Sequence, residues 1–331
     1  MAGLPKHAFD PVEHTADARP EAWISYMSYM HKVQPLLVPG RAFTASAESW
    51  VIERLVFSHV FFAPQTMRCE PGSSSVKGAP DILFGWVCRR GSGQFWHEGE
   101  MFDVGEGVFC LFDYGREMHS VTAQCEVYSV MIPHARVGYD PLKHPPRLIL
   151  DSKSEDGALV VGELERVIQT ADEMGRRDVP READRFSALL ATLLNRAGPR
   201  PKAFEDLQSR LQKYVDDHIF DKSLSLETLM ETFDASRGQV YAILDISESL
   251  DDYIARRRMN YALRSLAFGP PDPNRIQSIS DLCGYASTAT FESAFANLFG
   301  VPADIALGAV NTPHLRPNGE GSLGLWETWL A

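Results

Sequence analysis

The sequence predicts an α+β fold, with an N-terminal antiparallel β barrel or sandwich, a helical linker and an all-α C-terminal domain. Residues 41–133 hold short runs of aromatic and β-branched residues, which Gly and Pro interrupt at roughly ten-residue spacing, a pattern typical of antiparallel strands. Residues 155–197 hold two amphipathic helical stretches, and residues 204–308 show helical periodicity almost throughout. We therefore expect the β part and the final helical part to fold as separate domains.

Length, composition and charge limit the class of protein. The 331 residues, 44% of them hydrophobic, are enough for two or three domains with real cores. The chain has neither an apolar run long enough to span a membrane nor the charged and apolar regions of a secretion signal, so we expect a soluble cytoplasmic protein. The net charge of −12 gives no overall attraction to nucleic acid, and any DNA binding must come from a local patch.

The cysteines are expected to be mostly buried thiols. There are five, an odd number, and they are widely spaced with no C-x-x-C pair. That pattern argues against a disulfide framework and against a zinc site.

The N-terminal part divides into a lead-in and a β domain. Residues 1–40 contain five prolines and little periodicity, so they are expected to be irregular apart from one short helix near AWISYMSYM. Residues 41–150 are expected to form the β domain, and its strands are predicted in the runs WVIERLVFSHVFFA, DILFGWVCRR, GQFWHEGEMFDV, GVFCLF and CEVYSVMIP. The glycines of RRGSGQ and HEGE predict tight turns, because glycine tolerates positive φ.

The helical linker, residues 155–197, has two apolar stripes. The first consists of Val160, Val161, Leu164, Val167, Ile168 and Ala171, and the second of Phe186, Leu189, Leu190, Leu193 and Leu194. These stripes either pack on the β domain or pair with a second subunit, since an apolar stripe alone does not distinguish the two. The segment RAGPRPK, residues 196–202, is expected to be a hinge because prolines and glycine end the helix.

Residues 204–308 are predicted to contain two helix-turn-helix units. In the first, Ser225 is expected to cap one helix, and Ser236 and Gln239 form an S-x-x-Q capping box that begins the next. In the second, Ser278 is expected to cap a helix that Gly284 ends, and a further helix begins at Ser287. Such units place their second helix in the major groove of DNA.

At this point the sequence resembles the AraC/XylS family of bacterial transcription regulators. The resemblance is carried by LSLETLMETFDASRGQVYAIL, by the connector YIARRRMNYALRSL and above all by ISDLCGYASTATFESAFANLFGVPADI. The region GSGQFWHEGEMFDVGEGVFCLFDYGREMHS looks like the cupin-type sensor domain of that family. The resemblance implies double-stranded DNA and RNA polymerase as partners, a small-molecule effector and a homodimer.

The DNA-binding residues are expected to be concentrated in the first unit. Arg237, Gln239 and Tyr241 begin its second helix, where Arg suits guanine and Gln suits adenine. This prediction of DNA binding requires that residues 236–244 keep one face open to DNA. Gln239 is equally explained by its capping role.

The connecting helix carries three successive bases, Arg256, Arg257 and Arg258, which cannot share one face. We expect one of them to pair with Asp251 or Asp252 and another to contact phosphate.

The second unit is expected to add little binding energy. Family members place Arg or Lys in its second helix, whereas here Thr288, Thr290, Ser293 and Asn297 remain to face a groove. Hydroxyls and amides are weaker base contacts than a bidentate arginine. Residues 204–310 hold nine basic and sixteen acidic residues, a net charge of −7, which opposes binding to phosphate.

The β domain contains candidates for two kinds of ligand site. The side chains of Trp86, Cys88, Phe95, Tyr114 and Met131 either line a small-molecule cavity or are simple core residues. The set His97, Glu98, Glu100 and His119 resembles cupin metal ligands, but Gly99 stands where an H-x-H pair would need histidine. We therefore predict no metal site and interpret a histidine of this set as a solvent-exposed hairpin residue.

No motif indicates an enzyme or a cofactor. The sequence has no nucleophile elbow, phosphate-binding loop, dinucleotide fingerprint or H-E-x-x-H. The tail, residues 311–331, is polar before an apolar end with Trp326, Trp329 and Leu330, which either docks or stays disordered. The alternative to a DNA-binding regulator is a protein-binding module on the same scaffold. A cupin-type enzyme lacks a ligand set.

Overall fold

The structure is a computed structural model that describes residues 4–28, 32–69, 81–97, 100–198, 202–221, 223–244 and 249–309. It divides into two compact units, the first made largely of residues up to Gly198 and the second beginning at Pro199. The tail with Trp326, Trp329 and Leu330 lies outside the described residues, as do Glu98 and Gly99 of the expected HEGE turn.

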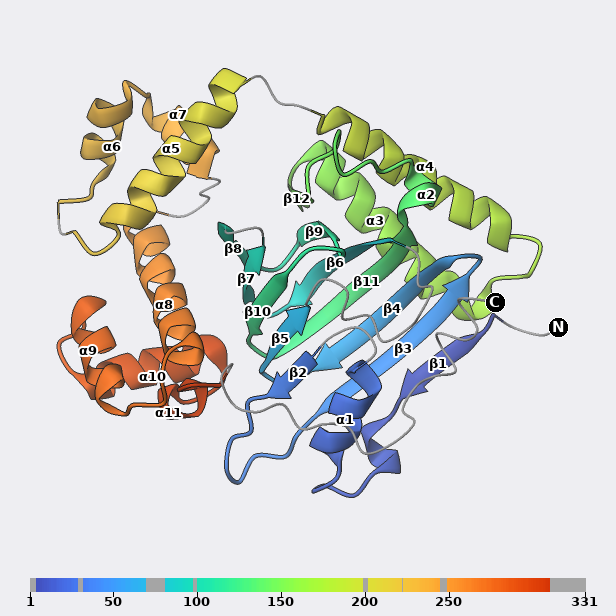
Figure 1. Ribbon diagram of the computed structural model, residues 1–331, viewed down its shortest axis with the longest axis horizontal. Helices are drawn as coiled ribbons and strands as arrows, with labels where there is room; N and C mark the ends of the chain where they lie inside the picture. The colour runs from blue at the N-terminus through green and yellow to red at the C-terminus, as the bar shows by residue number, and fades with distance from the viewer. Residues whose placement is uncertain are drawn as a thin grey trace. The chain divides into compact units, whose positions relative to one another are not determined.

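Two antiparallel sheets form the first unit (Figure 1), which confirms the predicted α+β class and the β sandwich. One sheet has seven strands in the order β1-β3-β4-β11-β6-β9-β12, and the other has five in the order β2-β5-β10-β7-β8. The seven are β1 (Lys6–Phe9), β3 (Ala45–Ile52), β4 (Leu55–Phe62), β11 (Cys125–Pro133), β6 (Ile82–Arg90), β9 (Val108–Asp113) and β12 (Arg147–Asp151). The five are β2 (Lys32–Pro35), β5 (Gln65–Cys69), β10 (Met118–Thr122), β7 (Gly93–His97) and β8 (Glu100–Val104).

The seven-stranded sheet is buried on both faces, because a hydrophobic core lies on each side of it. Successive side chains of a strand point to opposite sides, so each strand contributes to both cores. In β6, Phe84 and Trp86 belong to the core between the two sheets, whereas Leu83 and Val87 belong to a second core on the outer face. This explains why DILFGWVCRR reads as a continuous apolar run rather than an alternating one.

The lead-in is more regular than the sequence predicted. Its residues supply β1 and β2, the edge strands of the two sheets, as well as η1 (Pro11–Glu13) and α1 (Arg19–Met27). The short helix expected near AWISYMSYM is α1, and its Trp23 is fully buried in the core between the sheets. The five prolines misled the prediction, because edge strands tolerate proline and each of these strands has only four residues.

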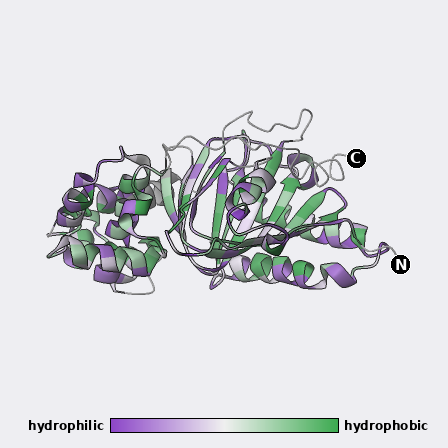
Figure 2. Ribbon diagram, turned by 90° about the horizontal axis from the view of Figure 1, so that it is seen from below, coloured by the Kyte–Doolittle hydropathy of each residue, from purple (hydrophilic) through white to green (hydrophobic). Residues whose placement is uncertain are grey.

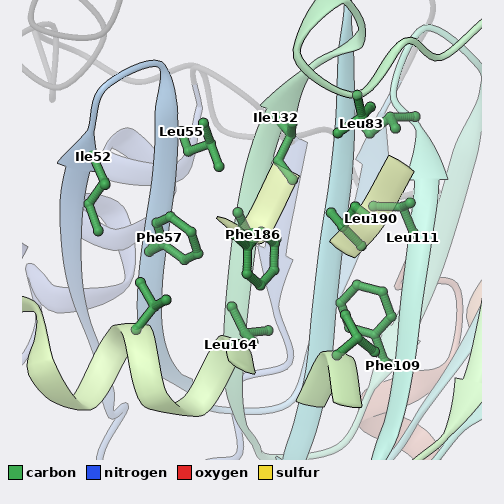
Figure 3. Close-up of a cluster of buried hydrophobic side chains, with 14 of the residues drawn as sticks. Ile52, Leu55, Phe57, Leu83, Phe109, Leu111, Ile132, Leu164, Phe186 and Leu190 are labelled. Carbon is green, nitrogen blue, oxygen red and sulfur yellow. The ribbon is translucent and has the colours of Figure 1, made fainter. Parts of the chain in front are cut away.

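The outer face of the seven-stranded sheet is covered by α3 (Glu155–Thr170) and α4 (Val179–Arg196), with α2 (His134–Val137) and η2 (Ala171–Glu173) beside them (Figure 1). Figure 2 shows both hydrophobic and hydrophilic residues along the helices that flank the sheet. Figure 3 shows Leu164, Phe186 and Leu190 directed at strand residues such as Phe57 and Phe109. The apolar stripes therefore pack on the β domain, and of the two alternatives for the linker the intramolecular one is correct. A homodimer stays a prediction.

A buried ionic network joins α3 to α4. Arg166 bonds to Glu163, with Nη2 2.7 Å from Oε1, and also to Glu182. The side chains of both glutamates are almost fully buried. Burial alone would raise the pKa of Glu182, but Arg166 and Arg181 outweigh it and hold that pKa below its usual value.

The second unit consists of helices. They are α5 (Lys202–His218), α6 (Leu226–Phe233), α7 (Arg237–Leu244), α8 (Leu250–Phe268), α9 (Asn274–Leu282), α10 (Thr288–Phe299) and α11 (Ala303–Ala306). The predicted helix pairs are α6 with α7 and α9 with α10. The first half of α8 packs with α5, α6 and α7 through Leu250 and Tyr253, while the Sδ of Met259 lies 3.3 Å from the hydroxyl of Tyr285 near α10. The continuous helix α8 thus contacts both helix-turn-helix pairs, α6–α7 and α9–α10.

The start of α9 differs from the prediction. The helix begins at Asn274, whose N–H bonds to a carboxylate oxygen of Asp272 at 3.0 Å, so Ser278 is an interior residue and not a cap. The hydroxyl of Ser278 donates instead to the Asn274 carbonyl at 3.3 Å. The predicted end is confirmed, since Gly284 follows the helix with a left-handed φ of 84°.

Candidate functional site

The start of α7 is built by two successive caps. Ser225 accepts a hydrogen bond from the Thr228 N–H at 3.2 Å and begins α6. Asp234 then takes a left-handed φ of 47° and turns the chain toward α7. At the next helix the Ser236 N–H donates to Gln239 Oε1 at 2.8 Å, and the Gln239 N–H donates to Ser236 Oγ at 3.3 Å. The predicted capping box is therefore confirmed.

The first turn of α7 keeps one face open to solvent. Arg237 and Gln239 are exposed, whereas Val240 and Ile243 are buried in the core formed with α5 and α6. Tyr241 is half-buried, and the Arg237 guanidinium lies 5.2 Å from its ring centroid. This cation–π contact holds the arginine over a rigid platform at the position where a recognition helix presents its first turn.

The capping role of Gln239 restricts what it can read. A bidentate contact to adenine needs both the side-chain oxygen and the side-chain NH₂. The oxygen is already an acceptor for the Ser236 N–H, so only the NH₂ is available while the cap is intact. A single donor suits guanine or thymine oxygens and phosphate equally, and therefore carries little sequence information.

The three arginines of α8 point in different directions. Arg257 pairs with Asp216 of α5 and is largely buried, and Arg258 donates from Nε to the Ile219 carbonyl at 2.7 Å. The guanidinium of Arg256 lies 5.5 Å from the ring of Tyr253. The ion pair of Arg257 is made with α5, and the pairing of one arginine with Asp251 or Asp252 stays a prediction. Two of the three thus join α8 to the segment around the end of α5.

The hydroxyls of α10 already donate hydrogen bonds within the C-terminal helical part of the chain. Thr288 donates to the side chain of Gln277, Thr290 to the Ser287 carbonyl at 3.0 Å and Ser293 to the Ala289 carbonyl at 2.9 Å. A hydroxyl has one donor, and phosphate oxygens are only acceptors, so these groups must break an internal bond to bind a phosphate. Asn297 is exposed, as is the acid Glu292 on the same helix.

The core residues expected to line a ligand cavity do converge. Trp86, Cys88, Phe95 and Met131 belong to the one cluster between the two sheets, and Tyr114 packs against it. The rings of Trp86 and Phe95, which come from opposite sheets, have centroids 4.8 Å apart. Burial of the Tyr114 side chain, and after it the neighbouring Cys69, raises the pKa of the Tyr114 hydroxyl well above its usual value, so this group stays neutral.

The exposed-histidine interpretation is wrong. His97 is fully buried on the inner face of β7, with its ring 5.5 Å from that of Phe112, and His119 is largely covered and bonds to Glu117 at 2.8 Å. Both belong to strands rather than to a turn. Across the described ranges, no three His, Cys, Asp or Glu residues are grouped as a metal site would require. The prediction of buried free thiols is confirmed for all five cysteines.

Comparison with known proteins places the first unit. The sequence model of the AraC-binding-like domain matches residues 21–195, more than half of the chain. The chain belongs to this family. It is a family of transcription regulators and not of enzymes.

The solved structure of CuxR supports the fold. The AraC-like transcriptional activator CuxR matches with a TM-score of 0.50 and 16% identity, over 79% of this chain and 96% of that chain. ToxT from Vibrio cholerae O395 matches at a TM-score of 0.31 and 12% identity, over 71% of this chain and 91% of that chain. A search of curated proteins gave no match. Across the described residues, no helix is long and apolar enough to cross a membrane.

Several polar residues inside the sandwich were missed from the sequence. Gln65, Ser120 and Ser129 are buried among the inward-facing apolar residues. A polar residue within an apolar strand was the available signal, but only strand register shows which of them share a face.

Proposed function

We propose that the protein is a sequence-specific DNA-binding regulator in which the sandwich binds a small molecule and controls how two helix-turn-helix units are presented to DNA. The observation that carries the proposal is the first turn of α7. Its caps fix the helix start, its inner face is buried, and Arg237 is exposed on it. A capped helix end with an exposed arginine has the geometry of direct base readout.

The two helix-turn-helix units contribute unequally to DNA binding. The first presents Arg237 on an open helix face, whereas α10 presents hydroxyls that are internally bonded and the carboxylate of Glu292. Within the α8 cluster, Arg256 is the residue that we propose for phosphate contact, with its guanidinium 5.5 Å from the ring centroid of Tyr253. We infer that specificity comes mainly from α7.

The sandwich supplies the regulatory input. A ligand that binds the core around Trp86 and Phe95 stabilises one conformation of this unit over another, and a change in populations then alters DNA affinity without chemistry. CuxR is named a transcriptional activator. By analogy, we propose that this chain forms a homodimer and activates transcription through contact with RNA polymerase.

The test is fluorescence anisotropy with the DNA upstream of the gene and with a scrambled duplex, at low and moderate salt. The wild-type chain should prefer the upstream DNA at both salt concentrations. Arg237→Met should weaken that binding by about 5- to 150-fold, the range of one good base contact at about 1–3 kcal/mol. Asn297→Ala, the matched change on α10, should have a smaller effect. Equal binding of both duplexes would reject the proposal, and a larger loss for Asn297→Ala would reverse the ranking of the units.

A protein-binding module is the second candidate, and the surface of α10 favours it. The helix has no basic residue, and its Glu292 is exposed. The same titration distinguishes the two candidates, because a protein-binding module would show no salt-dependent DNA affinity, whereas phosphate contacts give a slope of about −0.9 per contact.

A further inference from the structure

A row of polar residues crosses the inner face of the seven-stranded sheet. Strand register makes Ser49, Ser58, Ser129 and Trp86 successive neighbours on β3, β4, β11 and β6. All four are buried, and the hydroxyls of Ser49 and Ser58 lie 2.8 Å apart. They interrupt a face whose other members, such as Val127, are apolar. Three buried serines in one row are unusual for a core whose role is only packing, since buried hydroxyls need partners.

The facing sheet carries a second polar group at the same place. Ser120 of β10 lies between Met67 of β5 and Phe95 of β7 in the register, and Gln65 precedes Met67 by two residues on the same face. Gln65 is fully buried and Ser120 is 1% exposed. Because the Phe95 ring contacts that of Trp86 at 4.8 Å, Ser120 faces the Trp86 end of the serine row.

On each of Trp86, Gln65 and Ser120, one polar atom has no hydrogen-bond partner among the described residues. These atoms are Trp86 Nε1, Gln65 Nε2 and Ser120 Oγ. The other amide atom of Gln65, Oε1, accepts from Trp23 Nε1 at 2.8 Å, which fixes the orientation of the amide and leaves its NH₂ as the unused donor. The indole and the amide are donors only, and the serine can donate. Buried donors without acceptors are costly, so what the interior lacks is an acceptor.

We propose that these three donors bind an uncharged ligand that has an apolar body and carbonyl or ether oxygens. The proposal rests on the proposed sensor function and gives the chemical class of its effector. The apolar body suits the rings of Phe95 and Phe102, and the oxygens accept from Trp86, Gln65 and Ser120. An anion is disfavoured, because it would lose its hydration in a site whose three donors carry no charge.

Arg147 places a positive charge beside this interior. Its side chain is at the rim of the interior, with the guanidinium 5.5 Å from the Phe102 ring and Nη1 donating to the His97 carbonyl at 3.2 Å. These contacts hold the charge at the rim. A carboxylate is therefore the discriminating probe.

The experiment uses the full chain with ¹⁵N-labelled tryptophan. Trp86→Phe identifies the indole N–H signal of Trp86 by its loss. Trp96→Phe identifies the control signal, because Trp96 packs on His119 on the outer face of β7, with ring centroids 5.3 Å apart. Three probes share one ring size: cyclohexanone, cyclohexanecarboxylate and methylcyclohexane.

The Trp86 signal should move saturably with cyclohexanone, while the Trp96 signal stays in place. Ser120→Ala should weaken the cyclohexanone titration by about fivefold, as expected for one hydrogen bond. An unmoved Trp86 signal, an equal response to cyclohexanecarboxylate, or an equal response to methylcyclohexane would each overturn the proposal. The titration contains no DNA, so its failure is separate from failure of the regulator function, which the anisotropy measurement tests.

Discussion

Truncation of Phe186 to alanine tests how α4 is held. The side chain is fully buried, and its ring meets that of Phe57 edge-on at a centroid distance of 5.1 Å. Leu164 and Leu190 surround it (Figure 3). Replacing a buried phenylalanine by alanine removes its apolar contacts and leaves a cavity, which together cost about 3–5 kcal/mol. That is a large part of the roughly 5–15 kcal/mol that stabilises a typical domain.

The assay is urea unfolding of the full chain, followed by tryptophan fluorescence, at two protein concentrations tenfold apart. The expected result is a midpoint loss that is the same at both concentrations, because the contacts of Phe186 are intramolecular. The control is Leu159→Ala on α3, where the side chain is 51% exposed and the change should stay within about 0.5 kcal/mol. A loss under about 1 kcal/mol for Phe186→Ala would refute the packing described. A concentration-dependent loss would instead place this stripe at a subunit seam.

Three further predictions concern α3 and its surroundings. Arg166→Met should destabilise the protein by about 2 kcal/mol in urea unfolding, because it leaves the buried Glu163 and Glu182 short of a cation, although neighbouring arginines compensate in part. Since the pKa of folded Glu182 is depressed, its contribution is complete above the unfolded pKa and is lost as pH falls through the folded value; the wild-type midpoint should fall below about pH 4.3, and less so in Arg166→Met. Gly157→Ala should lower Tm, because the new Cβ would overlap the Asp151 carbonyl oxygen, which is backbone and cannot rotate away.

Local signals predicted the elements that depend on local chemistry. The capping box of Ser236 and Gln239 and the left-handed Gly284 follow from residues a few positions apart, and both are found. The short edge strands β1 and β2 were not predicted, because their hydrogen-bond partners lie in β3 and β5 and nothing local requires pairing. Tertiary pairing, and not propensity, makes these residues strands.

The candidate sites show the same limit. One arginine of the α8 cluster was expected to pair with Asp251 or Asp252 of its own helix, whereas the ion pair of Arg257 is made with Asp216, 41 residues away on α5. Spacing along one helix identifies i, i+4 pairs and says nothing of a neighbouring helix. Gln239 illustrates a different limit, since the same side chain fits a cap and a base contact, and only its hydrogen bonds show that the cap uses its oxygen.

The interior serine row could not be derived from the sequence at all, and the reason bears on function. Ser49 and Ser129 are eighty positions apart and become next-but-one neighbours only through the pairing of β4 with both β3 and β11. A one-residue slip of β4 would send Ser58 to the outer face against α4 and break the row. The register that buries Phe57 under Phe186 is thus the same register that turns Ser58 inward, so the packing of the linker helices on the outer face also fixes which polar side chains lie on the inner face. A ligand bound to the inner face as proposed would therefore act on β4, a strand whose outer face packs against α4 through Phe57 and Phe186.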